Sequence, residues 1–283
     1  MLKVGHEQAE MLISSIRVEA FMNALFESRY NHPHSSGKGA KLREEKQLIR
    51  VPSPGVDRSL GRNFGLIEAI ANASKGLVDL WEASPVRIDS NEPNTDEIID
   101  VLFPGNPLLC CGWSPHRFDT RPRGNWYRLQ DLQFIVPNPM TARHGLTREG
   151  NLSAHALSST GSRRFLVVEF DFDPSNSQQE ERLLERLAAE GRNVRDLCAA
   201  LLLHLAEKAP LALAVYSGGK SLHGWFYCAG VPEQKVRGFF NYAVSLNADL
   251  ANWTPSQFVR MPDGLRENGK RQTLYFLNRE VLK

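Results

Sequence analysis

RFLVVEFDFD (residues 164–173) is the stretch of sequence that decides the fold. Its first half is a run of apolar residues rich in β-branched and aromatic side chains, which is typical of a buried central strand. In its second half the acids Glu169, Asp171 and Asp173 alternate with two phenylalanines. Side chains at alternate positions of a strand lie on one face. We therefore expect three carboxylates on one face and the phenylalanine rings on the other.

Three neighbouring carboxylates favour a bound divalent cation. Their mutual repulsion raises their pKa values and destabilises the fold unless a positive charge lies between them. Oxygen ligands suit Mg²⁺ or Mn²⁺, and two such ions ~3.5–4 Å apart can clamp the attacking and leaving oxygens of a phosphoryl transfer. The alternative is a strand end in solvent, which the apolar opposite face disfavours. Asp171 is the first choice of ligand, with Glu169 or Asp173 as its partner.

Apolar spacing and end signals predict the other elements. The predicted helices are 6–30, 62–83 (broken near Gly76), 93–103 (capped by Asn94 or Thr95), 176–208 (split near Gly191) and 232–247 (opened by Pro232). The predicted strands are 107–113, 132–140, 164–173, 211–217, 221–230 and 272–278. From residue 164 the order strand, helix, strand, strand, helix, strand predicts an α+β fold with helices over one face of a mainly antiparallel sheet.

A glycine-rich turn follows the strand predicted at 211–217. YSGGKSLHGW (216–225) matches only the end of a P-loop, because Ala214 stands where the first glycine belongs and an alternating aromatic stretch follows where a helix should begin. We therefore favour a strand–turn–strand hairpin. Ser221 and His223 would then face the same way, with the charge of Lys220 beside them. A lone strand histidine is often structural, but this combination favours contact with nucleotide phosphates.

A polar loop before the acidic strand is rich in basic residues. It spans 141–164 and contains Arg143, His144, Arg148, His155, Arg163 and Arg164. Loops beside a site often carry function, and basic side chains bind phosphates. Phosphate contact and a solvated surface loop are equally good interpretations of this stretch.

Three short motifs, in this order, resemble those of the archaeo-eukaryotic primase superfamily. They are the acidic strand VVEFDFD (167–173), Ser221-Leu222-His223 as the small-x-His motif, and Ala248-Asp249 as the later hydrophobic-acid motif. The following stretch, 254–272, resembles the Arg-x-Pro-Gly segment of primase-polymerases from phages, plasmids and other mobile elements, except that Asp263 separates Pro262 from Gly264. The resemblance covers roughly residues 130–280.

The resemblance implies a catalytic core with an RRM-like palm, which is an antiparallel sheet with helices on one face. It implies two Mg²⁺ or Mn²⁺ ions, held by Asp171, Asp249 and either Glu169 or Asp173. It implies that the triphosphate of an NTP or dNTP contacts Ser221, His223, Lys220 and Arg260. The catalytic residues would be Asp171, Asp173, Asp249 and His223. Without the resemblance, Asp249 is more simply explained as a helix-end cap.

The implied function is that of a DNA primase or primase-polymerase in DNA replication. Such an enzyme performs template-directed nucleotidyl transfer from (d)NTPs on single-stranded DNA, and a replicative helicase would be a further partner. A template strand is held by basic side chains and by base stacking on aromatic rings. Candidates for this groove are Trp225, Trp253, Phe258, Arg266, Lys270 and Arg271. Core packing is the better explanation for Trp225.

Three regions follow along the chain on this interpretation. They are an N-terminal helix and flexible linker (1–60), an accessory mainly helical region (61–125) and a primase-like catalytic core (126–283). The linker contains His32 and His34, which lack a neighbouring carboxylate and are better explained as solvated than as metal ligands. The role of the first two regions stays open at this point.

Bulk composition is compatible with this function. The chain has 283 residues and a net charge of +2, from 34 Lys+Arg against 32 Asp+Glu, so a basic groove must come from local clustering. No apolar run approaches the ~20 residues of a membrane span, and MLKVGHEQAEML at the start lacks a signal-peptide pattern. Four scattered cysteines suit a reducing compartment. We therefore expect a cytoplasmic protein without membrane contact.

Other functions share parts of the pattern. A metal-dependent nuclease that nicks a replication origin would share the acidic strand but would need no triphosphate pocket. A non-catalytic RRM-like module that binds single-stranded nucleic acid would carry aromatic residues, not carboxylates, on its central strand. A zinc site at Cys110, Cys111 and His116 is disfavoured, because adjacent strand residues point to opposite faces.

Overall fold

Residues 61–87 and 94–283 are described by the computed structural model, and all of them fall within one unit of the chain, Ser53–Lys283. The α-helices are α2 (Phe64–Asn72), α3 (Leu77–Glu82), α4 (Thr95–Leu102), α5 (Gln178–Ala189), α6 (Val194–Ala206) and α7 (Glu233–Ser245). The strands are β1 (Leu108–Ser114), β2 (Arg117–Pro122), β3 (Phe134–Ile135), β4 (Gly145–Leu146), β5 (Leu152–Ser153), β6 (Phe165–Glu169), β7 (Leu211–Tyr216), β8 (Leu222–Tyr227), β9 (Val259–Arg260) and β10 (Leu274–Leu277). The predicted helix 6–30, the linker, His32 and His34 lie outside the described residues.

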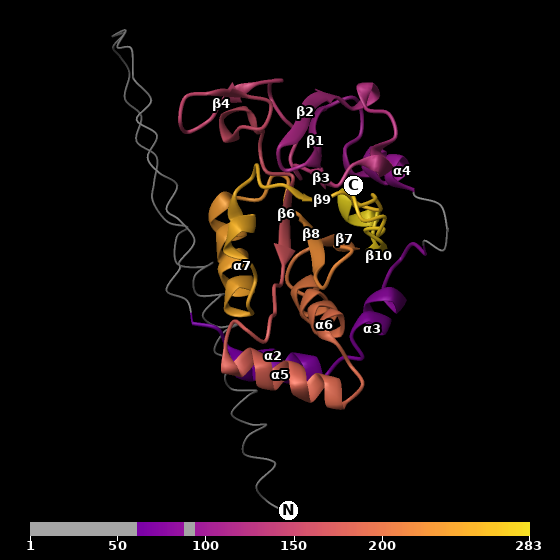
Figure 1. Cartoon of the computed structure of the whole chain (residues 1–283), viewed down its shortest axis with the longest axis vertical. Helices are drawn as coiled ribbons and strands as arrows, with labels where there is room; N and C mark the ends of the chain where they lie inside the picture. The colour runs from indigo at the N-terminus through magenta and orange to yellow at the C-terminus, as the bar shows by residue number, and fades with distance from the viewer. Residues whose placement is uncertain (1–60, 88–93) are drawn as a thin grey trace, which may run out of the picture. The chain divides into compact units, whose positions relative to one another are not determined.

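Two four-stranded antiparallel sheets form the body of this unit. The first sheet has the strand order β10-β7-β8-β6 and the second β2-β1-β3-β9. In Figure 1 the second sheet lies above the first, with α2, α5 and α6 below and α7 alongside β6. One cluster of buried side chains joins the first sheet to the helices, and another joins the two sheets. The predicted α+β class with antiparallel sheets is confirmed, and the second sheet on the other face is a feature that the sequence did not predict.

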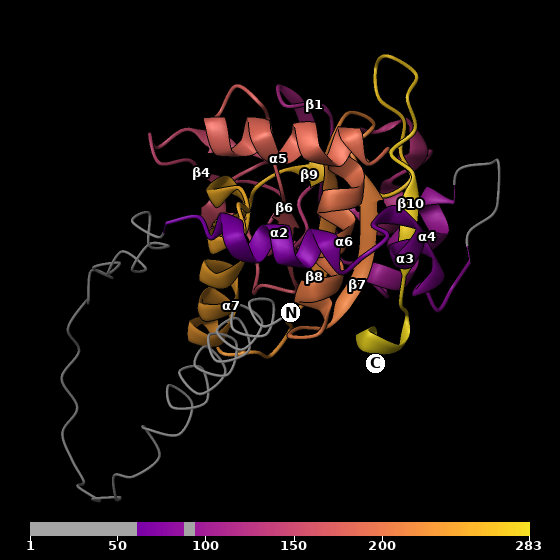
Figure 2. The same cartoon turned by 90° about the horizontal axis from the view of Figure 1, so that it is seen from below.

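The helical side of the first sheet is built as the sequence patterns predict. The helix expected at 62–83 is broken into α2 and α3, with Gly76 at a φ of +77° before α3. Any Cβ at this glycine would lie 2.4 Å from the Cβ of Asp196, so only glycine fits the break. The helix expected at 176–208 is split into α5 and α6. Seen from below, α2 and α5 run side by side (Figure 2), and the Arg186–Glu68 ion pair links them at 3.3 Å.

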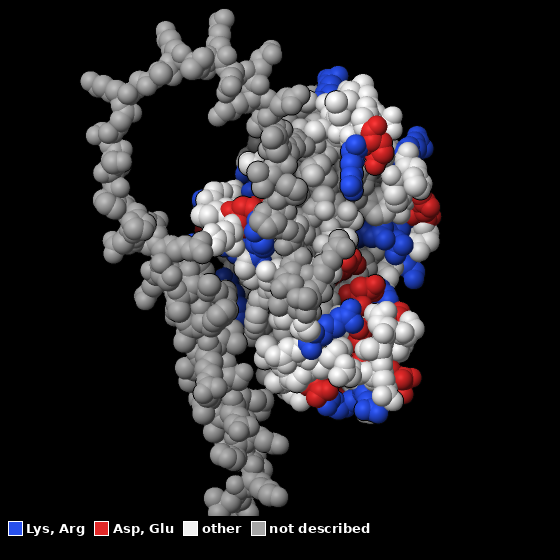
Figure 3. Space-filling model, turned by 90° about the vertical axis from the view of Figure 1, so that its left-hand side faces the viewer, with Lys and Arg blue, Asp and Glu red and all other residues white. Residues whose placement is uncertain are grey.

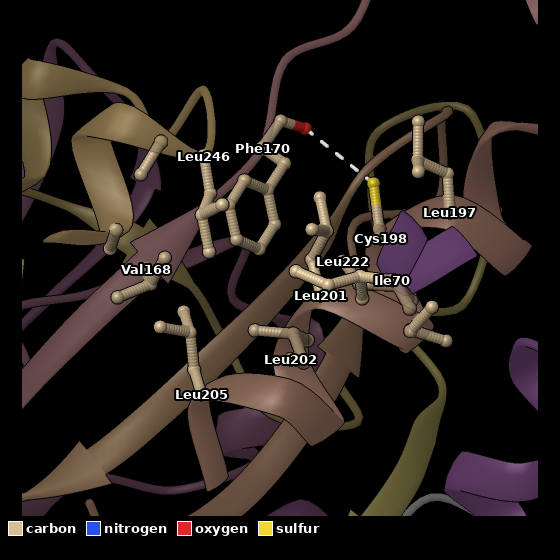
Figure 4. Packing of buried hydrophobic residues seen from close by; sticks show 14 of the residues in the cluster. Ile70, Val168, Phe170, Leu197, Cys198, Leu201, Leu202, Leu205, Leu222 and Leu246 are labelled. Carbon is tan, nitrogen blue, oxygen red and sulfur yellow. Dashed lines mark hydrogen bonds between the residues drawn. The ribbon is translucent and has the colours of Figure 1, made fainter. Parts of the chain in front are cut away.

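Alternation along β6 divides its side chains between the two cores. Phe165 and Val167 pack between the sheets, whereas Phe170, just past the strand, packs against the helices. Figure 4 shows this helix side, where the Cys198 thiol of α6 donates to the Phe170 carbonyl at 3.8 Å. The face that carries Glu169 is therefore the one directed toward the second sheet.

β6 ends at Glu169, so the prediction of a strand through Asp173 was wrong. The partner strand explains the early end. β8 begins at Leu222, and its pairing with β6 stops at Glu169↔His223. Past this point the only pairing that continues β6 among the described residues is the isolated bridge between Phe170 and Ala248. Asp171 and Asp173 therefore lie in a loop, although the two phenylalanines between the acids remain buried as predicted.

The region predicted to be mainly helical, 61–125, also contributes β1 and β2 to the second sheet. β1 pairs with β3, and β3 pairs with β9, so this sheet joins residues 108–122 to residues 259–260. The strand expected at 132–140 is reduced to β3, because Pro137 and Pro139 cannot donate to a ladder. Within the described ranges, no helix combines the length and the apolar character that a membrane crossing requires.

Candidate active site

Three segments that are far apart in the sequence meet at the edge of the first sheet. The antiparallel register of β6 and β8 sets Glu169 directly opposite His223. The backbone N–H of Asp249 donates to the Glu169 carbonyl at 2.9 Å. An isolated bridge between Phe170 and Ala248 extends this contact. Each of the three sequence motifs therefore contributes residues to one sheet edge.

Glu169 is tied to the residues of the hairpin motif. Its Oε1 accepts a hydrogen bond from Ser221 Oγ at 2.7 Å and lies 3.2 Å from His223 Nε2. Burial alone would raise the pKa of Glu169. The attraction of His223 and the Ser221 hydrogen bond outweigh this effect and, with the charge of Arg260, lower the pKa to about 2. Glu169 is therefore an anion whose carboxylate is already engaged.

His223 has unused hydrogen-bonding capacity in a buried position. Its side chain is 4 % exposed, and Nδ1 has no hydrogen-bond partner among the residues that the structure describes. Nε2 lies within ion-pair distance of Glu169, but the two groups are not aligned as a hydrogen bond. A buried polar atom without a partner is unfavourable by about 1–3 kcal/mol. Nδ1 of His223 is therefore a candidate for a hydrogen bond with a ligand.

Lys220 links the two carboxylates past the end of β6. Its Nζ lies 2.9 Å from Asp171 Oδ1 and 2.8 Å from Asp173 Oδ2. Hydrogen bonds with Asp173 and Asp171 raise the pKa of Lys220. The same contact with Lys220, aided by the N–H and Oγ donors of Ser175, holds the pKa of Asp173 well below its usual range. An ammonium group thus occupies the position between the carboxylates where the sequence predicts a cation.

Two arginines add positive charge on the same side. Arg260 lies over the Phe134 ring, 4.7 Å from its centroid. Burial, together with the nearby charge of Arg266, lowers the pKa of Arg260. Arg266 donates from Nη1 to the Ser217 carbonyl at 3.4 Å and lies against the turn at Gly219. An anion relieves the repulsion between such like charges, so this side of the site favours a polyanion.

Asp171 and Asp249 line one open pocket of about 590 Å³. Asp249 also caps the short 3₁₀-helix η4 (Leu250–Trp253), because its Oδ1 accepts from the Ala251 N–H at 2.9 Å. The simple capping role considered for Asp249 is therefore present, at a helix start instead of a helix end. The Asp171 side chain is 60 % exposed and contacts Lys220 as well as the pocket.

The same pocket contains polar residues that the sequence did not single out: Arg62, Asn176 and Asn247. Arg62 precedes α2, and the next residue, Asn63, donates its N–H to the Ser245 carbonyl at 2.8 Å. This bond holds the start of α2 against the end of α7. A signal for Asn247 existed, because asparagine after a helix often adopts a left-handed conformation. No local pattern pointed to Arg62.

The carboxylates fit a metal ion in a simpler arrangement than the resemblance implies. No group of three or more His, Cys, Asp or Glu side chains is gathered as a metal site within residues 61–87 and 94–283. Mg²⁺, however, is commonly held by one or two carboxylates together with waters and substrate phosphates. Asp171 and Asp249 line one pocket and are the candidates for such a pair. Glu169 is bound to Ser221, and Asp173 is bound to Lys220.

The residues considered for a template groove have mixed surroundings. Trp225 is fully buried between the sheets, as the packing alternative predicts. Arg271 makes hydrogen bonds of 2.6 and 2.7 Å to the buried Asp263, which is a structural ion pair. Phe258 stacks on His155 with ring centroids 4.0 Å apart.

Other basic residues lie at the surface or pair with neighbours. The guanidinium groups of Arg163 and Arg237 lie 4.5 and 5.9 Å from the ring centroid of Trp253. Lys270 and, in the basic loop, Arg143 and its neighbours His144 and Arg148 are exposed. On the face shown in Figure 3, basic and acidic side chains are interspersed.

The two adjacent cysteines point to opposite faces of β1, as predicted. Cys111 packs between the sheets, whereas Cys110 belongs to a small cluster on the outer face of the second sheet. Burial raises the pKa of the Cys110 thiol to about 12, so it stays protonated at neutral pH. His116 lies exposed in the β1–β2 turn. This arrangement disfavours a shared zinc ion.

No protein-family model, curated protein or solved structure matches this chain. The chemistry must therefore be argued from the site itself. Around Asp171 it has two unlike halves: a cationic side with a buried imidazole, and an open pocket with two carboxylates. Groups of this kind can bind a polyanion on one side and a cation with a second substrate on the other.

Proposed function

We propose that the chain is a primase-type nucleotidyltransferase, a DNA primase or primase-polymerase that joins NTPs or dNTPs along a single-stranded DNA template. The observation that supports this most is the meeting of three motifs at one sheet edge, with Glu169 opposite His223 and Asp249 bonded to the Glu169 backbone. A carboxylate pair beside a cationic surface is what metal-assisted nucleotidyl transfer requires. The first sheet would then be the RRM-like palm of the enzyme.

The cationic side would bind the triphosphate. His223 donates to a phosphate oxygen from its unpartnered Nδ1, and Ser221 Oγ lies beside it. Lys220 turns from the carboxylates toward the phosphates, and Arg260 with Arg266 balances the charge of the departing pyrophosphate. Charge-assisted hydrogen bonds of this kind are short and strong, and they stabilise negative charge that develops in the transition state.

The carboxylate side would hold the metal. Asp171 and Asp249 are the residues that fit a Mg²⁺ or Mn²⁺ ion, with phosphate oxygens and water as its remaining ligands. When bound, the ion lowers the pKa of the attacking 3′-hydroxyl and polarises the α-phosphate. Glu169 has a different task, because it orients His223 and Ser221 for the phosphates instead of ligating the metal.

Synthesis on single-stranded DNA tests the proposal. We expect the full chain to form or extend primers with Mg²⁺ or Mn²⁺ and a mixture of NTPs and dNTPs. Asp171→Asn should lower the rate by at least about 100-fold while thermal unfolding is unchanged, because the side chain is 60 % exposed. Glu185→Gln removes an exposed carboxylate from α5 and serves as the matched control.

Three experimental results would contradict the proposed function. If no nucleotide is incorporated with either metal, and calorimetry detects no nucleotide binding, the primase function is wrong. Metal-dependent nicking of DNA that Asp171→Asn abolishes would then favour the nuclease. DNA binding without either reaction would favour the non-catalytic module.

A further inference from the structure

The pocket beside Asp171 and Asp249 has walls that the proposed nucleotide site does not use. Its volume of about 590 Å³ lies within the range of ~300–1,000 Å³ that ligand pockets occupy. Besides the two carboxylates it is lined by the cation Arg62 and by the amides of Asn176 and Asn247. It therefore offers donors for an acceptor-rich ligand close to the residues that fit a metal.

Asn247 points to such a ligand independently of the charges. It is only 5 % exposed, and its Nδ2 has no hydrogen-bond partner among the described residues. Its backbone has a φ of +77°, a left-handed conformation that side-chain-bearing residues adopt rarely. A buried amide donor without an acceptor is unfavourable, and a ligand oxygen in the pocket would satisfy it.

Arg62, which lines the same pocket, is held in place by an ion pair. Its Nη1 donates to Glu180 Oε1 at 3.1 Å, and Glu180 is fully buried. The other oxygen of Glu180 accepts the Asp173 N–H and the Asn176 amide, each at 3.0 Å. A guanidinium carries five N–H donors, so the contact with Glu180 orients Arg62 without exhausting it. Its side chain is 47 % exposed, which leaves it accessible to a ligand.

The two sides of Asp171 differ in charge, and each side suits a different substrate of nucleotidyl transfer. The first side gathers three cations and an imidazole against two carboxylates. The basic groups are Lys220, Arg260, Arg266 and His223, and the carboxylates are Glu169 and Asp173. This side suits the multiply charged triphosphate. The pocket has one arginine and two carboxylates, so its own charge is negative and it suits at most a singly charged group with a hydroxyl, once a divalent cation on the carboxylates offsets their charge. The 3′ end of a nucleic-acid strand is such a group.

We propose that the pocket receives the 3′ end of the strand to be extended, and that Arg62 and Asn247 contact the phosphodiester nearest to that end. This inference rests on the proposed function and names its second substrate site. Asp171 lies between the two sides, which agrees with an attacking hydroxyl and a leaving pyrophosphate that must be in line across the reacting phosphate.

Equilibrium binding tests this assignment without requiring turnover. The probe is a fluorescent primer–template with a recessed 3′ end, measured by anisotropy with Mg²⁺ at several salt concentrations. A second probe carries a neutral methylphosphonate in place of the last phosphodiester of the primer. The variants are Arg62→Gln, which retains a donor for Glu180, and Asn247→Gly, which removes the amide but accepts the positive φ. Arg182→Gln, exposed on α5, is the matched control.

We expect Arg62→Gln to weaken binding of the normal probe on the order of fivefold and to reduce the salt slope by about 1. Asn247→Gly should weaken it about threefold, as expected for a hydrogen bond to a charged oxygen. The wild type should bind the methylphosphonate probe less tightly than the normal probe. Arg62→Gln should not weaken the binding of the methylphosphonate probe any further. Affinity for a free dNTP should not change in either variant.

The outcomes separate this inference from the proposed function. Equal affinity of wild type and Arg62→Gln for the normal probe, or a loss of dNTP affinity instead, would overturn the strand-end assignment while primer synthesis by the wild type still stood. Arg62-dependent probe binding by a chain that incorporates no nucleotide would support the strand site and refute the proposed reaction. A wild-type chain that does not bind the probe would refute the strand site directly.

Discussion

Glu169 and Asp171 are two residues apart and of the same chemical kind, yet they lie in opposite environments. Glu169 is the last residue of β6, its side chain is 24 % exposed, and it is bound to Ser221 beside His223. Asp171 lies past the strand end, is 60 % exposed, and contacts the ammonium group of Lys220. The point at which β8 stops pairing with β6 separates a carboxylate that holds the site together from one that is available for chemistry.

The comparison teaches that an alternating acidic pattern does not make its members equivalent. Within the strand, a carboxylate is fixed by whatever lies opposite it on the neighbouring strand. Past the strand, a carboxylate is free to exchange one cation for another. Stability measurements should therefore respond to Glu169, and activity and metal binding should respond to Asp171.

The largest expected effect on stability is that of Glu169→Gln. The surroundings that lower the pKa of Glu169 from 4.5 to about 2 stabilise its anion by about 3 kcal/mol at neutral pH. Urea unfolding should detect a loss of this size. Asp171→Asn, the paired variant, should change the free energy of unfolding by less than about 0.5 kcal/mol. Equal effects of the two substitutions on the free energy of unfolding would contradict the proposed difference between Glu169 and Asp171.

The same contrast predicts a pH dependence. A carboxyl group whose pKa is lower in the folded state stabilises the fold above its unfolded pKa and loses this contribution as pH falls through the folded value. For Glu169 the window runs from about pH 4.5 down to about 2. The difference in unfolding free energy between wild type and Glu169→Gln should shrink across this window. A difference that stays constant to the lowest accessible pH would mean that the charge of Glu169 contributes nothing.

A smaller effect on stability than that of Glu169→Gln is expected for Lys220→Met. Its ion pairs with Asp171 and Asp173 are half exposed, so the free energy of unfolding should change by less than about 1 kcal/mol. Without the competing ammonium, Mn²⁺ should bind several-fold more tightly, whereas the affinity for a dNTP should fall. Calorimetry with each ligand separates these effects. Lys208→Met, at an exposed position just past the end of α6, is the control. Weaker Mn²⁺ binding in Lys220→Met would show that Lys220 does not compete with the metal.

Much of the fold follows from local patterns in the sequence. The break at Gly76 and the split between α5 and α6 appear where glycine interrupts the apolar spacing. The strands on either side of the Gly218-Gly219 turn form the predicted hairpin. Phe170 is buried because the alternation of side chains persists just past the end of β6. These features depend on backbone freedom and on apolar periodicity, which neighbouring residues determine.

Other features depend on partners that no local pattern reveals. The end of β6 depends on where β8 begins, and the second sheet depends on pairing between residues 108–122 and 259–260. Arg62 enters the pocket because Asn63 is bonded to the end of α7. Hydrogen bonds of this kind join segments that are far apart in the sequence, and neither segment has a local pattern that identifies its partner.

By itself the sequence determined the class of the fold, the residue types available for chemistry and the alternation that keeps acids and phenylalanines apart. Only the tertiary structure decided which acid is buried, which one faces a pocket, and which cation each one meets. The physical reason is that composition and periodicity set what a segment can bury, whereas the electrostatic environment of a carboxylate depends on the groups that other segments bring within a few ångströms of it.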